Sequence, residues 1–228
     1  MGSLIEVKNV TRDFQTPGGK VSVLKGITCT IEPDTMCILR GKSGSGKTTL
    51  LNIIGALDDP TSGQILIDGK SSHSMSAIAR ENMRRRQMGF VFQSVSLIPS
   101  MNAIQNVEFA MRMAGIGEDM DKRAADVLSI VGLSNRMTHM PQEMSGGEQQ
   151  RVAIARAIAH HPRIILADEP TAELDSGMAT EVTRLFKQIS EEEHVTIIMT
   201  THDVGLMGAG DQLIELKNGR IEGSGEDV

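Results

Sequence analysis

Residues 41–48 read Gly-Lys-Ser-Gly-Ser-Gly-Lys-Thr, a glycine-rich loop that ends in a lysine and a hydroxyl residue. A chain that wraps around phosphates must turn tightly with its N–H groups pointing inward, and glycine permits this because it has no Cβ. The pattern predicts that Lys47 reaches the β and γ phosphates of a nucleoside triphosphate and that Thr48 is a ligand of Mg²⁺. The candidate nucleotide-binding residues of this loop are Gly41, Ser43, Gly44, Ser45, Gly46, Lys47, Thr48 and Thr49.

The segments on either side of this loop have the patterns of a strand and a helix. Residues 36–39 are continuously apolar, as expected for a strand that is buried on both faces. A helix is predicted after the loop, with an inner face formed by Leu50, Leu51, Ile53, Ile54 and Leu57. This order places the positive N-terminal end of the helix at the phosphates.

A second apolar strand is predicted at residues 164–167, and it ends in Asp168 and Glu169. Ligands of open α/β sheets bind at the carboxyl ends of the strands, so this acidic pair is expected to meet the phosphate loop. Asp168 is predicted to hold Mg²⁺ with Thr48, and Glu169 to activate the attacking water as general base. A solvated acidic pair is the alternative, and the phosphate loop in the same chain makes it the weaker one.

The segment Met144–Arg151 predicts a helix that begins with a capping serine, Ser145, followed by Gly146 and Gly147. Such a terminus exposes free N–H groups to an anion. An ordinary N-cap is the alternative reading. Because the phosphate loop already supplies a complete phosphate-binding helix terminus, the second one is best explained as acting on the nucleotide of another subunit.

Length and composition indicate one large globular domain, or one domain that carries a subdomain, in 228 residues. A net charge of −6 argues against a general nucleic-acid surface, so no nucleic-acid partner is expected. Cys29 and Cys37 have no metal-ligand spacing and are predicted to be buried thiols in a reducing compartment. No apolar run approaches the roughly 18 residues that span a bilayer, and no secretory signal is visible, which predicts a cytoplasmic chain.

The order of elements predicts an α/β fold. Residues 4–10, 21–31 and 64–68 are expected to form an antiparallel β portion, and a final hairpin is expected to turn at Asn218-Gly219. Helices are predicted across residues 101–131, where Ile104, Val107, Met111 and Ala114 recur at helical spacing. Apolar strands at residues 164–167 and 195–200 then alternate with helices, which is typical of a parallel sheet.

Taken together, these motifs resemble the ATP-binding cassette family. In order, they are the phosphate loop, Gln93, the Ser-Gly-Gly motif, the Asp-Glu pair, Leu174-Asp175 and His202. The resemblance covers essentially the whole chain, and it implies a P-loop NTPase with a parallel core sheet, an antiparallel β subdomain and an inserted α-helical subdomain. It therefore predicts a single domain over residues 1–228, with the helical subdomain at roughly 94–160. The runs at residues 53–58 and 89–93 look like the lipoprotein-release and macrolide-export branch.

The resemblance also implies roles for individual residues. Phe14 falls where the family stacks an aromatic side chain on adenine, although a core phenylalanine is the alternative. Gln93 would contact Mg²⁺ and the water, and His202 would hydrogen-bond the γ phosphate; a surface glutamine and a structural histidine are the alternatives. The implied catalytic residues are Glu169, His202, Gln93 and Lys47, the implied metal ligands are Thr48, Gln93 and Asp168, and ATP and Mg²⁺ are the implied cofactors.

Further residues are implied to contact a second ATPase subunit. Ser145, Gly146, Gly147 and the residue that follows them would face the partner's ATP, and Asp175 belongs to the dimer-contact loop of the family. The chain departs from the family at Glu148, where glutamine is usual, and at Met144, where leucine is usual. An acid beside the partner's nucleotide should weaken binding unless Glu148 turns to the ribose hydroxyls.

The predicted function is ATP hydrolysis by a homodimer that closes head to tail and drives export or extraction through a separate integral membrane permease. The chain would then be peripheral on the inner face of the membrane. Nine of the fifteen methionines lie between Met83 and Met144, and they are predicted to be mostly core, with some lining a groove for the permease. The basic run at residues 80–86 is predicted to be a solvated helix end.

Two other functions remain open at this stage. The cassette could act without transport, as in cell division, repair, translation or enzyme activation, or it could be a regulatory module that hardly hydrolyses ATP because of Glu148. A GTPase is disfavoured because no Asn-Lys-x-Asp motif occurs, and a kinase because no substrate-binding lid is visible.

Overall fold

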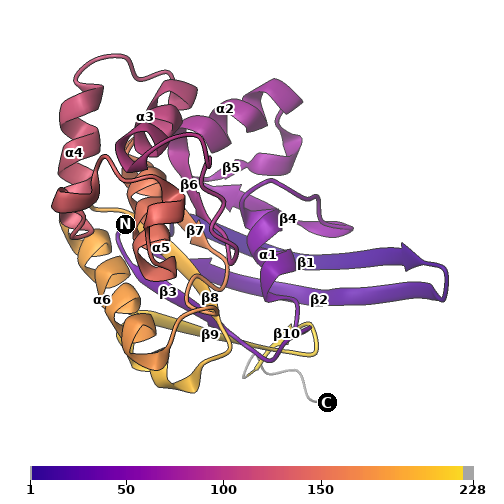
Figure 1. The fold of residues 1–228 in the computed structure, drawn as a ribbon. Helices are drawn as coiled ribbons and strands as arrows, with labels where there is room; N and C mark the ends of the chain where they lie inside the picture. The colour runs from indigo at the N-terminus through magenta and orange to yellow at the C-terminus, as the bar shows by residue number, and fades with distance from the viewer. Residues whose placement is uncertain (1, 223–228) are drawn as a thin grey trace.

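The computed structural model describes residues 2–222 and arranges them as two β-sheets, with the helix at residues 47–54 packed against strands of both sheets and the other helices on the outside (Figure 1). The ends of the predicted domain, residue 1 and residues 223–228, lie outside the described residues. The strands are β1 (Ile5–Thr16), β2 (Gly19–Ile31), β3 (Met36–Arg40), β4 (Ser62–Ile67), β5 (Lys70–Ser71), β6 (Met88–Val91), β7 (Ile164–Ala167), β8 (Thr196–Thr201), β9 (Gln212–Lys217) and β10 (Arg220–Ile221). The α-helices are α1 (Lys47–Ile54), α2 (Ala77–Gln87), α3 (Ala103–Ala114), α4 (Met120–Ile130), α5 (Gly146–Ile158) and α6 (Ser176–Glu192).

Six strands form the core sheet, in the order β10-β9-β3-β8-β7-β6. The neighbours from β9 to β6 pair in parallel, and β10 closes the edge as an antiparallel hairpin with β9. That hairpin turns at Asn218 and Gly219, both with positive φ, which confirms the predicted turn. The α/β fold with a parallel core sheet is therefore confirmed.

Both faces of the core sheet are covered, which explains why its strands are continuously apolar. In β3, Met36 and Ile38 belong to one apolar cluster with residues of α3, α4, α5 and α6. Cys37 and Leu39, which point to the opposite face, belong to a second cluster with residues of α1 and the antiparallel sheet. Because side chains alternate along a strand, burial of consecutive residues requires a layer on each side.

The antiparallel sheet has the order β2-β1-β4-β5 and extends to one end of the molecule, away from α3 and α4 (Figure 1). It confirms the predicted antiparallel β portion. The first strand is longer than predicted, because the segment expected at residues 4–10 continues as β1 to Thr16 before the turn to β2. Phe14 therefore lies in the strand, opposite Val21.

Helices α3 and α4 lie in the stretch expected to be a helical subdomain and pack against α5 (Figure 1). Helix α3 begins with a capping box between Asn102 and Gln105, and it ends at Gly115 in the left-handed conformation. Two short 3₁₀ helices, η2 (Ser134–Arg136) and η3 (Pro141–Glu143), connect α4 to α5. The bounds of this subdomain, roughly 94–160, stay a prediction.

Two predictions about the region after the phosphate loop are wrong. Leu57 does not lie on the inner face of a helix, because α1 ends at Ile54 and Ala56 takes the left-handed conformation (φ 51°), which turns Leu57 outward. The basic run of α2 is not a solvated end throughout, since Arg84 is half-buried and donates to the carbonyl of Ala56 at 2.8 Å.

The methionines in and around the helical subdomain are only partly buried. Of the nine methionines between Met83 and Met144, the four buried ones are Met83, Met88, Met111 and Met144.

Within residues 2–222, no helix combines the length and the apolar character needed to cross a bilayer.

Candidate functional site

Four neighbouring parallel strands deliver the predicted catalytic residues to one edge of the core sheet. Strand β3 leads into the phosphate loop, β8 into His202, β7 into Asp168 and Glu169, and β6 is followed two residues later by Gln93. These strands are adjacent in the order β3-β8-β7-β6. Since they run in parallel, their carboxyl ends meet, as ligand sites of open α/β sheets require.

Lys47 is buried, with only 4% of its surface exposed. Its ammonium donates to the carbonyl of Gly41 at 2.8 Å and to that of Lys42 at 3.3 Å, and it lies 3.2 Å from Glu169 Oε1. A buried ammonium needs such partners because desolvation is otherwise costly. The cation of the loop is thus fixed beside the carboxylate predicted to act as general base.

The glycines of the loop fit a chain that curls tightly. Gly44 and Gly46 have positive φ (78° and 106°), a backbone conformation that residues other than glycine rarely adopt. At Gly41 a Cβ would overlap the backbone oxygen of Leu216, so close approach of β9 requires glycine there. The hydroxyl of Ser45 is buried and has no hydrogen-bond partner within residues 2–222. An unpaired buried hydroxyl at this position suits an oxygen of a bound phosphate.

Asp168 is held by two hydroxyl groups. Its Oδ1 accepts hydrogen bonds from Thr48 Oγ1 at 3.0 Å and from Thr200 Oγ1 at 2.7 Å. The described residues contain no group of three or more His, Cys, Asp or Glu side chains that could hold a metal by themselves. Mg²⁺ in nucleotide sites takes one or two carboxylates with substrate phosphates and water, so the carboxylate and hydroxyl of this pair fit that ion.

Glu169 contacts both predicted catalytic neighbours. It has an unusual backbone conformation for a side chain of its size (φ 44°), and its N–H donates to Thr200 Oγ1 at 2.8 Å. One carboxylate oxygen, Oε1, faces Lys47, and the other, Oε2, lies 3.1 Å from His202 Nδ1. The two oxygens therefore join the loop lysine to the histidine after β8.

Gln93 is exposed and lines the same hollow as Thr48, Thr49 and Glu169. A second hollow joins the phosphate loop, including Ser43, to Glu169 and His202. The structure therefore brings Gln93 and His202 to opposite sides of Glu169. Gln93 is a surface glutamine after a strand, and the hollow that it lines contains residues of the phosphate loop.

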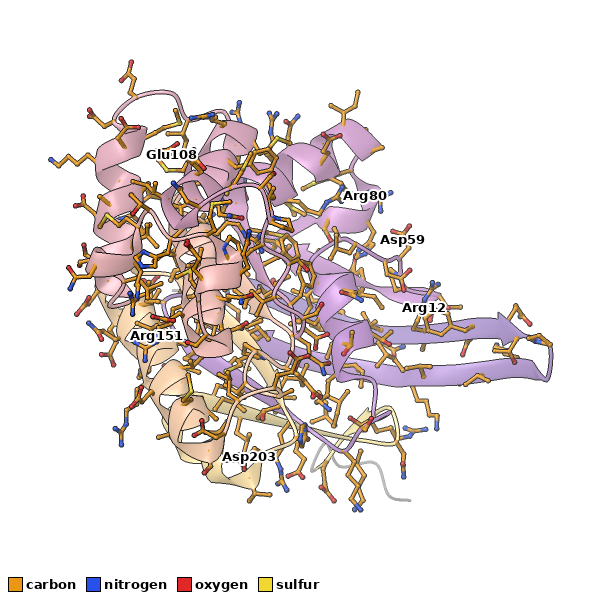
Figure 2. All side chains as sticks on the ribbon, in the orientation of Figure 1. Arg12, Asp59, Arg80, Glu108, Arg151 and Asp203 are labelled. Atoms are coloured by element: carbon orange, nitrogen blue, oxygen red, sulfur yellow. The ribbon has the colours of Figure 1, made fainter. Side chains whose placement is uncertain are left out.

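Phe14 lies on β1 with 37% of its surface exposed, so it is not a core phenylalanine. The guanidinium of Arg12 lies over its ring, 4.5 Å from the centroid. Arg12, labelled on β1 in Figure 2, is itself fixed by Asp58 through two hydrogen bonds of 2.9 and 2.7 Å. Val21 lies opposite Phe14, two residues before Val23, which lines the hollow at the phosphate loop.

The helix that begins after Ser145 has the predicted capping serine, and the structure adds a reciprocal contact from Glu148 that completes a capping box. Ser145 Oγ accepts from the N–H of Glu148, and Glu148 Oε2 accepts from the N–H and the hydroxyl of Ser145 at 2.8 and 2.9 Å. The hydrogen bond from the backbone of Ser145, together with its hydroxyl and Arg136, lowers the pKa of Glu148 to about 2. Glu148 is thus an anion at neutral pH, and its carboxylate caps its own helix.

The start of α5 opens to a hollow separate from the phosphate loop. Ser145, Gly147 and Glu148 line it together with Arg136 and Arg151. Within the described part of the chain, no residue lines both this hollow and those around the phosphate loop. Gly146 is exposed at the first turn, whereas Gly147 is buried against Met178 of α6, where a Cβ would overlap the Met178 methyl group.

Asp175 is the N-cap of α6, and its Oδ1 accepts from the N–H groups of Gly177 and Met178 at 3.0 and 3.1 Å. The resemblance assigned Asp175 to a dimer-contact loop and did not predict this capping role. The structure also adds four residues to the predicted site: Thr200, Arg12, Asp58 and Arg136. Thr200 could have been found because it is a hydroxyl residue near the end of the strand that leads to His202. The other three act through contacts between distant segments.

An open apolar groove lies between α2, α3 and the segment after β6. Its exposed apolar side chains are Leu57, Phe92, Phe109 and Met113, and Phe90 stacks on Phe92 with ring centroids 6.0 Å apart. Arg84, Arg85 and Arg156 line the same groove. Contiguous exposed apolar side chains with a polar rim are typical of a surface that contacts another protein.

Comparison with known proteins gives a consistent set of relatives. A protein-family model described as "ABC transporter" matches residues 24–172. An ABC transporter ATP-binding protein of Methanocaldococcus jannaschii, MJ0796, is 42% identical over 96% of this chain and 95% of its own length. A dimeric structure of MJ0796 in a post-hydrolysis state bound to ADP and Pi superposes with a TM-score of 0.87 at 39% identity, covering 96% of both chains.

Longer relatives match over one part only. The macrolide export ATP-binding/permease protein MacB of Syntrophobacter fumaroxidans is 41% identical over 96% of this chain but 31% of its own length. MacB of Wolinella succinogenes is 44% identical over 99% of this chain and 35% of its own length. The chain thus spans about a third of the length of these relatives.

Proposed function

The chain belongs to the ABC transporter family, and we propose that it is the ATP-hydrolysing subunit of a transporter, in which two copies close head to tail around two ATP molecules. The observation that carries this proposal is the meeting of Lys47, Glu169 and His202 at the ends of neighbouring strands. A loop lysine that neutralises phosphate charge and a side chain that orients the attacking water are recurring parts of enzymes that hydrolyse nucleoside triphosphates, and Glu169 contacts both Lys47 and His202.

The phosphate loop binds and orients the triphosphate. The N–H groups at the start of α1 point to the β phosphate, and Lys47 neutralises the β and γ phosphates. Ser45 donates its otherwise unpaired hydroxyl to a phosphate oxygen. Phe14, with Arg12 over its ring, offers a flat surface to adenine.

Thr48, Asp168 and Gln93 would hold Mg²⁺. The ion would supply positive charge that offsets the negative charge of the phosphates during hydrolysis. Asp168 contributes a carboxylate already oriented by the hydroxyls of Thr48 and Thr200. Gln93 would contribute its side-chain amide from the segment that follows β6, the outermost strand of the four.

Glu169 accepts the proton of the attacking water. Its two carboxylate oxygens contact Lys47 and His202, which holds the side chain beside the phosphate loop. His202 contacts Glu169 through Nδ1, which places its ring beside the γ phosphate of a bound triphosphate, where a ring nitrogen that carries a proton would donate to a phosphate oxygen. The water is therefore activated on one side and the phosphate is polarised on the other.

The second half of each active site comes from the partner copy. In this chain the start of α5 lies in a hollow that shares no lining residue with the phosphate loop among the described residues. Its N–H groups at Gly146 and Gly147 suit the γ phosphate bound by the other copy, whereas the N–H and hydroxyl of Ser145 donate to Glu148 and would have to be released before Ser145 could contact that phosphate. Dimeric MJ0796 bound to ADP and Pi supports this assembly.

The test is the solution mass of Glu169→Gln with and without Mg-free ATP. We expect the mass to double on addition of ATP, because the variant binds ATP without consuming it. The matched control is Glu169→Gln combined with Lys47→Ala, which should stay monomeric because it lacks the phosphate ligand. A parent variant that binds ATP and stays monomeric contradicts the two-chain site.

We place the permease contact in the groove of Leu57, Phe92, Phe109 and Met113. An apolar groove next to the segment of Gln93 suits a short amphipathic helix of a membrane protein. Movement of Gln93 at the γ phosphate then passes through β6 and the following segment to the permease. The chain is then held at the inner face of the membrane by its partner, and the similarity to MacB supports export or extraction as the direction.

Purification of the tagged chain from membranes of its host tests this contact. An integral membrane protein should co-purify with the wild type and be lost with Phe109→Glu and Met113→Glu, whereas ATP-driven dimerisation of the same variants in the Glu169→Gln background should be unchanged. Recovery of the same membrane protein with both variants contradicts the groove as its contact. The identity of the captured protein also separates a transporter from a cell-division partner.

A further inference from the structure

Glu148 is an acidic residue in the first turn of α5, close to where we expect the partner copy's phosphate to bind. Its carboxylate belongs to the first turn of α5, whose N–H groups we assign to the partner copy's γ phosphate. Two anions in such proximity repel each other, and an exposed carboxylate has only water and salt to screen it. Something in the chain must compensate this charge if the second half-site is to accept a triphosphate.

The compensating group is Arg136. It comes from η2, twelve residues before Glu148, and its Nε donates to Glu148 Oε1 at 2.9 Å. Its Nη1 lies 3.2 Å from His139 Nε2, so the guanidinium is held from a second side. Arg151, labelled in Figure 2, lines the same hollow but pairs with Glu181 of α6 at 2.9 Å. Among the described residues, Arg136 is therefore the cation that contacts Glu148.

The two carboxylate oxygens of Glu148 have different partners, so Arg136 also affects the position of this side chain. Oε1 accepts from Arg136, and Oε2 accepts from the N–H and hydroxyl of Ser145. With Oε1 fixed, the carboxylate is turned back toward the cap of its own helix. Within residues 2–222, the cap contacts of α5 leave the N–H groups of Gly146 and Gly147 without a carboxylate partner.

We propose that Arg136 is a positioning residue of the two-chain active site: it neutralises Glu148 and holds it on Ser145, so that the start of α5 accepts the triphosphate bound by the partner copy. This inference rests on the proposed head-to-tail dimer. It explains how a chain with glutamic acid at this position keeps a working second half-site, and it makes the importance of Arg136 conditional on Glu148.

A double-mutant cycle tests whether the effect of Arg136 depends on Glu148. Arg136→Gln, Glu148→Gln and their combination are made in the Glu169→Gln background, and the ATP concentration for half-maximal dimerisation is read by light scattering at low ionic strength. With Glu148 present, Arg136→Gln should raise this concentration by about fivefold or more, and with Gln at position 148 by less than about twofold. Glu148→Gln alone should change it by less than about twofold, because its charge is already compensated.

Two further measurements separate charge from architecture. Arg136→Lys retains the positive charge and should recover most of the loss, and high salt should reduce the defect of Arg136→Gln because it screens the exposed anion. ATP binding by the monomer, which uses the phosphate loop of the same chain, reports whether each variant is folded. If Arg136→Gln does not fold, Arg136→Lys and Glu148→Gln still test the proposal. Both should dimerise at nearly the same ATP concentration as the parent, because one keeps the positive charge and the other removes the negative charge that it compensates.

The outcomes are distinct. An equal effect of Arg136→Gln with either residue at position 148 overturns the inference, as does an Arg136→Lys variant as poor as Arg136→Gln. In both cases the parent still dimerises, and the proposed function stands. A parent that remains monomeric with ATP removes the two-chain site, and the inference falls with it.

Discussion

Lys47 and Glu169 form a contact of 3.2 Å between the ammonium of the phosphate loop and one oxygen of the carboxylate that follows β7. The two residues are far apart in sequence, but their strands are separated in the sheet only by β8. Lys47, which we expect to bind phosphate, and Glu169, which we expect to activate water, are therefore electrostatically coupled without a nucleotide. A change at one of them should alter the task of the other.

The first prediction concerns Glu169→Gln. Hydrolysis should fall by at least about 100-fold, because the general base is lost. Affinity for Mg-free ATP should rise by about three- to tenfold, because a negative charge beside Lys47 and the phosphates is removed. Phosphate release and calorimetric titration measure the two effects. Glu173→Gln, an exposed acid of the same segment, should change neither, and loss of ATP affinity in Glu169→Gln would contradict the coupling.

The second prediction concerns the base-stacking surface. Phe14→Ala should weaken ATP binding by about 1–3 kcal/mol, the usual worth of an aromatic–base stack, and leave binding of inorganic tripolyphosphate unchanged. Arg12→Gln should have a smaller effect of the same kind, because Arg12 touches the ring and not the phosphates. Phe109→Ala is the matched control, since Phe109 has nearly the same exposure (38%) but lies in the distant groove. Equal losses for ATP and tripolyphosphate would rule out stacking.

The third prediction compares two glycines of the loop. Gly41→Ala should cost more than about 2 kcal/mol, because the new Cβ meets the backbone of Leu216 and lies 2.5 Å from Ser45 Oγ. Gly44→Ala should cost only about 1 kcal/mol, because its surroundings are open and only its positive φ is strained. Urea unfolding of both variants measures the difference in free energy of unfolding. The opposite order would mean that the loop packs differently from this structure.

The fourth prediction follows from the two thiols. Cys37 is buried as predicted, whereas Cys29 is only half-buried. Desolvation raises the pKa of both from 9.0 to about 12. Between these values the thiols ionise in the unfolded chain but not in the folded one, so their contribution to stability is complete below pH 9 and is lost as the pH rises toward 12. The free energy of unfolding should fall by up to about 1.4 kcal/mol per pH unit for each thiol in this range.

Urea unfolding at pH 8 and at pH 10.5 tests the thiol prediction. The double variant Cys29→Ala, Cys37→Ala should lose less stability than the wild type over this interval, because it has no thiol to ionise. Lysines titrate in the same range in both proteins, so the difference between the two proteins isolates the thiols. An identical loss in both would show that the thiols do not contribute.

Much of the chemistry could be predicted from sequence because it is encoded in short contiguous segments. The loop at residues 41–48, the acids after the strand at 164–167 and the turn at Asn218-Gly219 each need only local geometry. Continuous apolar runs predicted strands covered on both faces, and the two apolar clusters confirm this. Local backbone preferences and side-chain alternation act between near neighbours in the chain, so they are visible without tertiary structure.

The errors and omissions come from a local turn that the apolar pattern did not reveal and from contacts between segments that are not neighbours in sequence. Leu57 turns outward because α1 ends at Ile54 and Ala56 takes the left-handed conformation, and Arg84 is half-buried because it reaches back to that same turn. The pairing of Arg12 with Asp58 joins residues 46 positions apart. Sequence patterns report the preferences of neighbouring residues, whereas such contacts arise only once the whole chain has closed on its core.

The sequence by itself thus determined the set of groups that carry the chemistry and the order of the elements that hold them. Only the tertiary structure decided how their charges are distributed. Glu148 looked like an acid that would oppose a bound phosphate, but Arg136 and Ser145 hold its two oxygens. The charge that a residue presents is set by the groups around it, because a nearby cation and hydrogen-bond donors offset a carboxylate at close range.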